Sequence, residues 1–353
     1  MNDKKPPAST DSRPARLADV AAAAGVGPSV VSRILNEDPL LSVRPETRER
    51  VQAAARELDY RPNFLARGLR SARTMTIALV VPNLTHPVNA AIIHGANAAA
   101  TERGYASLVV DASEFFASGQ AFTNLLREHR VDGVLVAGAS DDATSRDLLD
   151  DLMRLRFPFV LANRRLPGIE PYVVLDDAAG MELAVDHLVG LGHRRVALIS
   201  GPATADTAVR RLEGFRRGMR KAGRRIAREH VVESTVEEEG GFRAMEALLG
   251  LARRPTAVAV WSLGAAVGAL AAARRTGLTM PRDLSVVAFH DAPIAAYLDP
   301  PLTTVQMALG RMAEESVGLL LDQINGEQVS SRVIDVPPVL VLRDSTSTPA
   351  GGA

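Results

Sequence analysis

Residues 17–36, LADVAAAAGVGPSVVSRILN, have the types and spacing that DNA recognition requires. They predict a short alanine-rich helix, a turn at Gly25-Val26-Gly27 and a second helix that begins at Pro28. Two short helices joined by a glycine-containing turn form a helix-turn-helix, which places its second helix in the DNA major groove. Arg33 lies on that second helix, and a guanidinium can pair with both major-groove acceptors of guanine. The alternative for Arg33 is a solvated charge or a phosphate contact.

Residue patterns that would support catalysis or metal binding are missing from the sequence. It contains no Gly-x-Ser-x-Gly nucleophile elbow, no Gly-x-x-x-x-Gly-Lys phosphate loop and no His-Glu-x-x-His zinc motif. Asp176-Asp177 and Glu237–Glu239 are interpreted as loop or helix-start charges. With no cysteine, disulfides and thiolate metal sites are excluded. We therefore expect no enzyme activity, no catalytic residue, no metal and no cofactor.

Charge is divided unevenly along the 353 residues, although the net charge is zero. Residues 1–73 hold 13 Lys/Arg and 9 Asp/Glu, a net charge of +4, whereas the remainder holds 28 and 32, a net charge of −4. A basic head on an acidic body suits a local module that contacts phosphates. The first 15 residues lack an apolar signal core, and no apolar run reaches about 18 residues, so we expect a cytoplasmic, nucleoid-associated protein without a membrane partner.

Helices must position the DNA-reading residues, and apolar side chains recur through the head at helical spacing. The stripes are Leu17, Val20, Ala21 and Ala24 in the first helix, Val30, Val31, Ile34 and Leu35 in the second, and Val51, Ala54, Ala55 and Leu58 in a third that follows Pro45. A fourth segment, Pro62 to Leu69, is short enough to be disordered alone and to fold only on DNA.

Beyond Thr76 the pattern changes to strands that alternate with amphipathic helices. The predicted strands are Ile77–Val81, Ser107–Val110, Gly133–Val136, Phe159–Leu161, Val173–Leu175, Arg195–Ile199, Ala257–Val260 and Ser285–Phe289. Predicted helices between them include Val88–Arg103, Ala178–Gly190, Ala208–Ala222 and Phe242–Leu251. Such alternation predicts an α/β body of two parallel sheets, whose facing lobes enclose a cleft at the carboxyl ends of the strands.

Several motifs in the same order resemble the lactose-repressor (LacI/GalR) family of transcription regulators, from about residue 17 to 346. Besides the head, they are Tyr60-Arg61-Pro62-Asn63, Ala66-Arg67-Gly68-Leu69-Arg70, Val80-Val81-Pro82-Asn83-Leu84, Leu191-Gly192-His193-Arg194, Ser200-Gly201-Pro202, Arg211-Leu212-Glu213-Gly214-Phe215, Arg254-Pro255-Thr256-Ala257-Val258 and Pro300-Pro301-Leu302-Thr303-Thr304-Val305. The resemblance implies an all-α helix-turn-helix head and hinge helix, followed by a two-lobed effector domain like periplasmic binding proteins.

The resemblance also implies DNA contacts in the head and hinge. Pro28, Ser29 and Arg33 would reach base edges, with Ser32 and Asn36 near the DNA backbone. In the hinge, Leu69 would be a wedge in the minor groove, and Asn63 and Ala66 would face that groove. The alternative for Leu69 is a buried linker residue. Gly27 stands where the family usually has a serine cap and Val30 where it has a hydroxyl residue, so two DNA-binding hydroxyls are missing.

For the effector, the resemblance implies a cleft wall of Val88, Asn89, Asn163, Arg164, Thr207, Arg211, Trp261, Ser262 and His290. Arg211 is the leading candidate, because its donor fork suits hydroxyls or a carboxylate; the alternative is a surface charge. Trp261 could stack on a ligand or belong to the core. His290 stands where the family commonly has an acceptor aspartate, and Ser262-Leu263 where it has Asn-Asp. Since imidazole can donate, an anionic effector becomes plausible beside a neutral sugar.

We therefore predict a transcriptional repressor whose affinity for a near-palindromic operator is controlled by a sugar, sugar acid or sugar phosphate. A homodimer is expected, because the family's tetramerisation tail has no counterpart here. The predicted divisions are 1–15 tail, 16–60 DNA-binding domain, 61–75 hinge helix and linker, 76–346 effector and dimerisation domain, and 347–353 disordered tail. Its N-lobe would comprise about 76–163 and 305–333, and its C-lobe about 164–304 and 334–346. The alternative is a cytoplasmic solute-binding or sensor protein with no operator-specific role.

Overall fold

The computed structural model describes residues 15–35, 38, 41–60, 73–112, 126–128, 130–137 and 143–350. By its internal contacts the chain divides into two compact units, Met1–Thr74 and Met75–Ala353, which are treated separately below. Residues 1–14 of the predicted tail and the predicted hinge segment Pro62–Leu69 lie outside the described residues.

The head contains the predicted helix-turn-helix. Its described helices are α1 (Leu17–Ala24), α2 (Pro28–Leu35) and α3 (Pro45–Glu57). The chain bends by 102° between α1 and α2, as helix-turn-helix motifs do. Gly25 makes this bend possible, because it ends α1 with a left-handed φ of 66° that side chains disfavour.

A small apolar core holds the three helices together. Its buried members are Val20, Ala21, Ala24, Val31, Ile34, Val51, Ala54 and Ala55. The prediction for Leu58 was wrong: it follows the last residue of α3 as the C-cap and is exposed. Among the described residues, no single helix is long and apolar enough to cross a membrane, although α1 and α2 taken together pass that test by length and composition.

Each lobe of the second unit is built on one six-stranded sheet. The first sheet is parallel throughout and has the order β11-β5-β4-β3-β1-β2. Its strands are β1 (Thr76–Val81), β2 (Ala106–Asp111), β3 (Gly133–Ala137), β4 (Phe159–Ala162), β5 (Tyr172–Val174) and β11 (Arg332–Val333). Its described helices are α5 (Pro87–Glu102), α8 (Ala143–Arg154) and α13 (Leu309–Ile324).

The second sheet has the order β12-β10-β9-β8-β6-β7 and is parallel except for the last strand of the chain, which runs antiparallel to its neighbour. Its strands are β6 (Val196–Ser200), β7 (Val231–Glu233), β8 (Ala257–Val260), β9 (Ser285–Phe289), β10 (Thr303–Gln306) and β12 (Val339–Val341). Its helices are α9 (Asp177–Gly190), α10 (Asp206–Lys221), α11 (Glu238–Leu249) and α12 (Leu263–Arg275), with short 3₁₀ turns at Arg228–His230 and Pro293–Tyr297.

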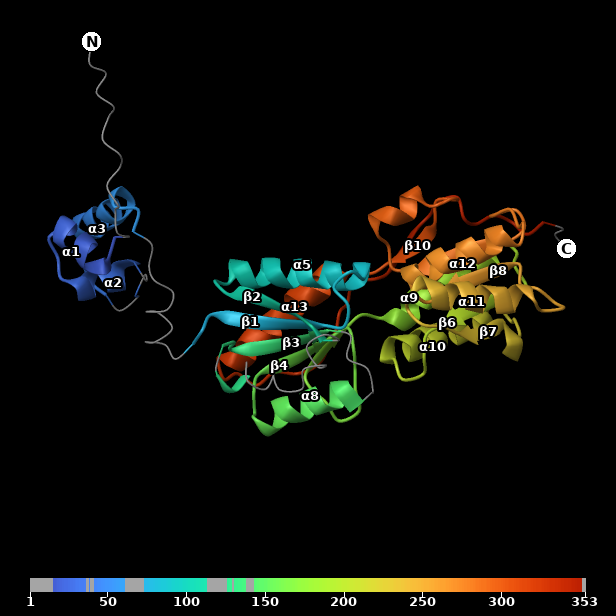
Figure 1. Cartoon of the computed structure of the whole chain (residues 1–353), viewed down its shortest axis with the longest axis horizontal. Helices are drawn as coiled ribbons and strands as arrows, with labels where there is room; N and C mark the ends of the chain where they lie inside the picture. The colour runs from blue at the N-terminus through green and yellow to red at the C-terminus, as the bar shows by residue number, and fades with distance from the viewer. Residues whose placement is uncertain are drawn as a thin grey trace, which may run out of the picture. The chain divides into compact units, whose positions relative to one another are not determined.

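Both sheets are covered on both faces, as parallel sheets require (Figure 1). In β1, Ile77 and Leu79 pack into a core with α5 and α13, whereas Val80 packs into a core with α8. In the second lobe, α9 and α10 cover one face, and α11 and α12 the other. The carboxyl ends of all these parallel strands are therefore left for ligand-binding loops.

The chain crosses between the lobes three times, and two crossings differ from the prediction. β5 lies in the predicted C-lobe range 164–304 but pairs with β4, so the first crossing follows Val174. β10 extends to Gln306 within the second sheet, so the return follows residue 306. Periodicity identifies a strand but not its partner, and backbone pairing decides the sheet to which a short strand belongs.

Residues 347–350, the described part of the tail 347–353 that was predicted to be disordered, follow a segment bonded to the second sheet. The Ser345 side chain is buried and donates to the Val286 carbonyl oxygen at 2.6 Å. The Ser347 backbone N–H donates to Ser285 Oγ at 3.0 Å. These bonds fix the segment to the amino end of β9, and small polar side chains here satisfy buried backbone groups rather than mark a loose tail.

Candidate functional site

Helix α2 exposes part of the predicted DNA-reading set. Pro28 and Ser29 are exposed in its first turn, and Arg33, one turn after Ser29, is partly exposed. Ser32 is buried against the core of the head, which disfavours the predicted contact with the DNA backbone. Asn36, Asn63, Ala66 and Leu69 lie outside the described residues.

Arg33 is oriented by an acidic neighbour. Its Nε donates to Asp38 Oδ2 at 2.7 Å, and the Arg33 side chain keeps 42% of its surface exposed. Such an exposed ion pair is weak, about 0–1 kcal/mol, and is easily exchanged for a stronger acceptor. Arg33 is therefore both held in place and available to a base or a phosphate.

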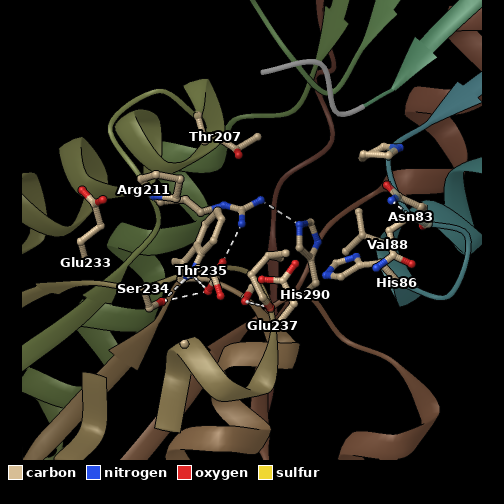
Figure 2. Close-up of a pocket in the computed structure, with 18 of the residues that line it drawn as sticks. Asn83, His86, Val88, Thr207, Arg211, Glu233, Ser234, Thr235, Glu237 and His290 are labelled. Atoms are coloured by element: carbon tan, nitrogen blue, oxygen red, sulfur yellow. Dashed lines mark hydrogen bonds between the residues drawn. The ribbon is translucent and has the colours of Figure 1, made fainter. Parts of the chain in front are cut away.

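A cavity of about 710 Å³ lies at the carboxyl ends of the strands of both lobes, and all nine predicted cleft residues line it (Figure 2). Val88 and Asn89 come from the first turn of α5, and Asn163 and Arg164 follow β4. Thr207 and Arg211 lie at the start of α10. Trp261 and Ser262 follow β8, and His290 follows β9. Open α/β sheets commonly bind ligands at this edge.

Sequence reasoning missed several lining residues. The polar ones include Asn83, His86, Glu233, Ser234, Thr235, Glu237 and Arg243. His86 and Asn83 could have been found, because they follow the first predicted strand and precede a helix-starting proline. Glu237 was interpreted only as a helix-start charge; it is the N-cap of α11 and also lines the cavity. β7 was not predicted, because its three residues are only partly buried or exposed and end in a charge, Glu233.

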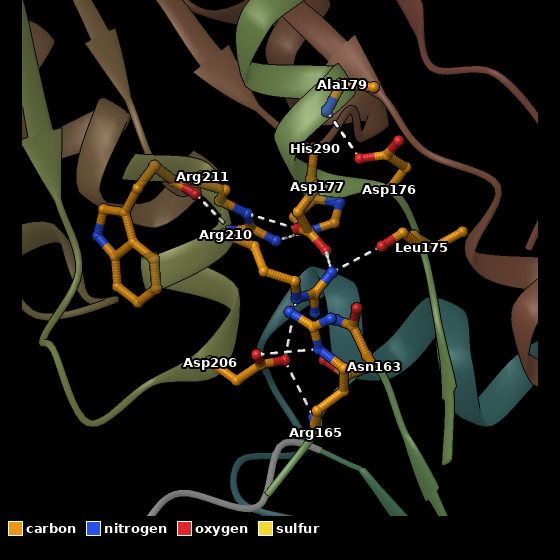
Figure 3. Close-up of polar contacts among 11 residues, drawn as sticks. Asn163, Arg165, Leu175, Asp176, Asp177, Ala179, Asp206, Arg210, Arg211 and His290 are labelled. Atoms are coloured by element: carbon orange, nitrogen blue, oxygen red, sulfur yellow. Dashed lines mark hydrogen bonds and ion pairs between the residues drawn. The ribbon is translucent and has the colours of Figure 1, made fainter. Parts of the chain in front are cut away.

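A network of arginines and aspartates, most of it buried, reaches the cavity wall through Arg211 (Figure 3). Asp177 Oδ1 accepts from Arg211 Nε at 2.7 Å, and Asp177 Oδ2 accepts from Arg210 Nη1. Arg210 Nε donates to Asp206 Oδ2 at 3.0 Å, and the same carboxylate pairs with Arg165 from the other lobe at 3.3 Å. The network therefore links the lobes with charge-assisted bonds.

Arg211 is buried at 3% exposure, so the alternative of a surface charge is wrong. Most of its donors are already used within the protein. Besides Asp177, Nη1 donates to the Trp261 carbonyl oxygen at 2.6 Å and Nη2 donates to His290 Nε2 at 2.8 Å. Its guanidinium carbon also lies 4.0 Å from the centroid of the Phe289 ring. Arg211 thus organises the cavity wall as well as facing it.

Two further lining residues have structural duties. Ser262 caps α12, because its Oγ accepts from the Ala265 N–H at 3.2 Å and donates to the Val236 carbonyl oxygen. Trp261 Nε1 donates to Ser234 Oγ at 3.1 Å. A Cβ on Gly201 would lie 2.4 Å from the indole ring, so the Gly201 backbone packs against Trp261. Trp261 therefore packs in the core and also lines the cavity, and its stacking on a ligand stays a prediction.

Four polar atoms of the cavity wall are buried without a hydrogen-bond partner among the described residues. They are His86 Nε2, Asn163 Oδ1, Arg164 Nη1 and His290 Nδ1. Asn163 and His290 also have left-handed backbones, with φ of 62° and 70°. Strained backbones and unsatisfied buried polar atoms are costly, and both tend to occur where a ligand binds.

Burial and charge shift the pKa values of these groups. Burial, together with the nearby Arg211 charge, lowers the pKa of His290 well below its usual value, and acts in the same direction on His86. Burial and the same Arg211 charge lower the pKa of Arg164 to about 10. At neutral pH, His290 is therefore neutral while Arg164 remains a cation.

The comparisons with known proteins agree with this geometry. Residues 16–63 match the model of bacterial regulatory proteins of the lacI family, and residues 185–346 match the periplasmic binding protein-like domain. The HTH-type transcriptional repressor CytR of Escherichia coli K12 is 34% identical over 336 residues, covering 94% of this chain and 96% of CytR.

Two solved structures extend the likeness to three dimensions. The complex of the transcriptional regulator CelR with cellobiose has a TM-score of 0.71 and 32% identity, covering 94% of this chain and 99% of CelR. The lac repressor dimer bound to operator and the anti-inducer ONPF has a TM-score of 0.77 and 28% identity, and the match covers 95% of this chain and 100% of the lac repressor chain.

The fold and the cavity define a DNA-binding transcriptional regulator, in which a helix-turn-helix head precedes a periplasmic-binding-protein-like domain. The chain belongs to the lacI family of bacterial regulatory proteins. The relatives named above are regulators of transcription and not enzymes.

Proposed function

We propose that this chain is a repressor whose operator affinity is controlled by a small molecule bound in the cavity between the lobes. One observation carries the proposal: a single chain joins a helix-turn-helix to a cavity whose wall contains four unsatisfied buried polar atoms. A ligand that satisfies those atoms in one arrangement of the lobes favours that arrangement, and DNA affinity then shifts through the hinge.

For DNA recognition, we propose that Pro28, Ser29 and Arg33 contact base edges. The exposure of all three on α2 supports this assignment. Asn36, Asn63, Ala66 and Leu69 are proposed as further contacts, and the segment 61–75 as a hinge between the DNA-binding domain 16–60 and the effector domain 76–346. A homodimer would place two heads on the half-sites of a near-palindromic operator.

For the effector, we propose a sugar, sugar acid or sugar phosphate. The relative CelR was solved with cellobiose, which supports a carbohydrate ligand. The cavity has the size and the mixture of apolar and polar groups that small-molecule sites need. We further propose that the protein acts in the cytoplasm and catalyses no reaction.

Gel-shift titration tests the proposal, with full-length protein and an operator selected from random near-palindromic DNA. We expect a discrete complex in the nanomolar range at about physiological salt. Leu69→Ala should weaken it at least tenfold without changing the thermal stabilisation by ligand. A chain that binds ligand but prefers no DNA sequence would instead favour the solute-binding or sensor alternative.

A further inference from the structure

We propose that the effector carries a negatively charged group, a carboxylate or a phosphate, which Arg164 binds as its counter-ion with the help of His290 Nδ1. The inference deepens the proposed function, because it names the ligand class of the same cavity and therefore rests on that function. It is carried by charge and hydrogen-bonding capacity at one end of the cavity wall.

The first observation is an excess of positive charge. Arg165, Arg210 and Arg211 share two carboxylates, those of Asp177 and Asp206 (Figure 3). The charges of these two carboxylates also act on Arg164, which is bonded to neither. Both carboxylates are already paired with other arginines. Within the described residues, Arg164 has no ion pair, and its buried Nη1 has no hydrogen-bond partner. A buried cation without a partner is costly, and an anionic ligand would remove that cost.

The second observation concerns His290. Arginine can only donate, so the bond from Arg211 Nη2 makes His290 Nε2 an acceptor. The neutral imidazole must then carry its proton on Nδ1, and this buried N–H has no acceptor in the part of the chain that the structure describes. His290 thus presents a donor where an aspartate would present only acceptors, so this position no longer repels an anion.

The third observation is the start of α10, a helix of 16 residues whose N-cap is Ala205, a residue with no polar side chain. Ala205 and Thr207, on either side of its first residue, line the cavity together with Arg164. The N-terminus of a helix favours negative charge and offers free backbone N–H groups. A guanidinium, an imidazole N–H and a helix start thus all contribute donors to the wall of the same cavity.

Two carboxylates, those of Glu233 and Glu237, line the cavity. Glu237 and Glu238 act on the charge of His86, whereas the acidic groups that act on Arg164 are Asp206 and Asp177. Figure 2 shows Glu237 on the side of the cavity opposite Thr207. The cavity therefore offers the cation of Arg164 to an acidic group of a ligand and the carboxylate of Glu237 to ligand hydroxyl donors.

The test is a thermal-melting panel on the full chain at fixed ionic strength. Matched ligands share a carbon skeleton and differ in charge: D-glucose, D-gluconate and D-glucose 6-phosphate; D-galactose and D-galacturonate; D-ribose and D-ribose 5-phosphate. Inorganic phosphate alone is tested beside them. We expect only the charged ligands to raise the melting temperature. If the sugar acids raise it more than the sugar phosphates, the bound group is a carboxylate, and if the phosphates raise it more, it is a phosphate.

Variants assign the effect to Arg164. Arg164→Gln should raise the half-saturating concentration at least tenfold, equivalent to about 1.4 kcal/mol. Arg164→Lys keeps the charge and should lose about threefold, which also shows that the site still folds. Arg225→Gln, an exposed arginine outside the cavity, should change nothing.

Three results would overturn the inference. They are a melting temperature that only neutral sugars raise, a melting temperature that no anion of the panel raises, and stabilisation by the anions that is as large in Arg164→Gln as in the unsubstituted chain. Melting needs no DNA, so its outcome is separate from the gel shift. Operator binding released by a neutral sugar would keep the proposed function and reject the anion. Anion binding without operator binding would keep the inference of an anionic ligand and reject the proposed function as a repressor.

Discussion

At the scale of single residues, the cavity is built from side chains with two duties. Arg211 faces the cavity, yet it joins Asp177, the Trp261 carbonyl and His290 through three different nitrogens. His290 depends on Arg211 for its tautomer. A change at either residue therefore alters both the ligand contacts and the shape of the wall that presents them.

Arg211→Ala should destabilise the effector domain as well as impair its ligand response. The substitution removes one partner of a buried ion pair, so we expect the free energy of unfolding to fall by about 3 kcal/mol. The loss is no larger because Arg210 still pairs with Asp177. Urea unfolding followed by circular dichroism measures it. Arg216→Ala, at an exposed position of the same helix, should stay within about 0.5 kcal/mol. Equal unfolding midpoints for the two variants would contradict the structural role of Arg211.

Stability should fall as the pH falls below about 6.5. Burial lowers the pKa values of His86, His193 and His290 in the folded state. Below the ordinary histidine pKa of about 6.5, the unfolded chain binds protons that the folded chain does not, so acid favours unfolding. Each of these histidines lowers the free energy of unfolding by up to about 1.4 kcal/mol for each pH unit below about 6.5. Urea midpoints at several pH values measure this slope, and His290→Asn should make it shallower. A pH-independent midpoint would refute the burial of these imidazoles as neutral groups.

At the scale of elements, glycines set how closely helices pack beside the cavity. A Cβ on Gly268 of α12 would lie 1.7 Å from the Glu238 carbonyl oxygen at the start of α11. No side chain fits at that distance, so the backbones of the two helices are in direct contact. Glu237, which lines the cavity, immediately precedes that contact.

Gly268→Ala should therefore push α11 away from α12 and weaken ligand binding. We expect at least about 2 kcal/mol lower stability, the size of an overpacked core. Gly318→Ala is the matched control, because that glycine lies inside α13 with open space around its missing Cβ. There alanine should stabilise the chain by about 0.5–1 kcal/mol through helix propensity. Urea unfolding of both variants checks the opposite signs, and a stable Gly268→Ala chain would contradict the close helix contact.

The sequence predicted where helices and strands lie better than which strands pair and which side chains bond to one another. Apolar runs of four or more residues, such as those of β1 and β9, were found because burial on both faces leaves a continuous pattern. Four strands at the sheet edges or next to them, β7, β10, β11 and β12, were missed, because none of them contains a run of four apolar residues. The nine cleft residues came from the family resemblance. The bonds that occupy Arg211 and Ser262 depend on partners distant in sequence, which no local pattern reveals.

At the scale of the whole molecule, the two units use charge differently. The head needs surface charge that meets DNA phosphates, whereas Arg164 is half-buried in the cavity wall and its Nη1 is fully buried. Salt screens exposed charges strongly and buried ones much less. The two binding activities of one chain should therefore respond differently to ionic strength.

Operator affinity should fall steeply with salt while ligand affinity changes little. With about six phosphate contacts, operator binding should weaken roughly a thousandfold between about 50 and 200 mM salt. Gel shifts and ligand-induced melting over the same salt series compare the two. A ligand affinity that declined as steeply as operator affinity would mean that the cavity charge is open to solvent.

Trp261 gives this protein a built-in reporter. It is the only tryptophan in the sequence, and it lies in the cavity wall between the Gly201 backbone and the Arg211 guanidinium. Intrinsic fluorescence excited at the red edge of the indole band therefore comes from the cleft and nowhere else. A ligand that moves Arg211 or changes the packing of the ring would alter the emission, so occupancy could be followed in the unlabelled protein, on DNA or free.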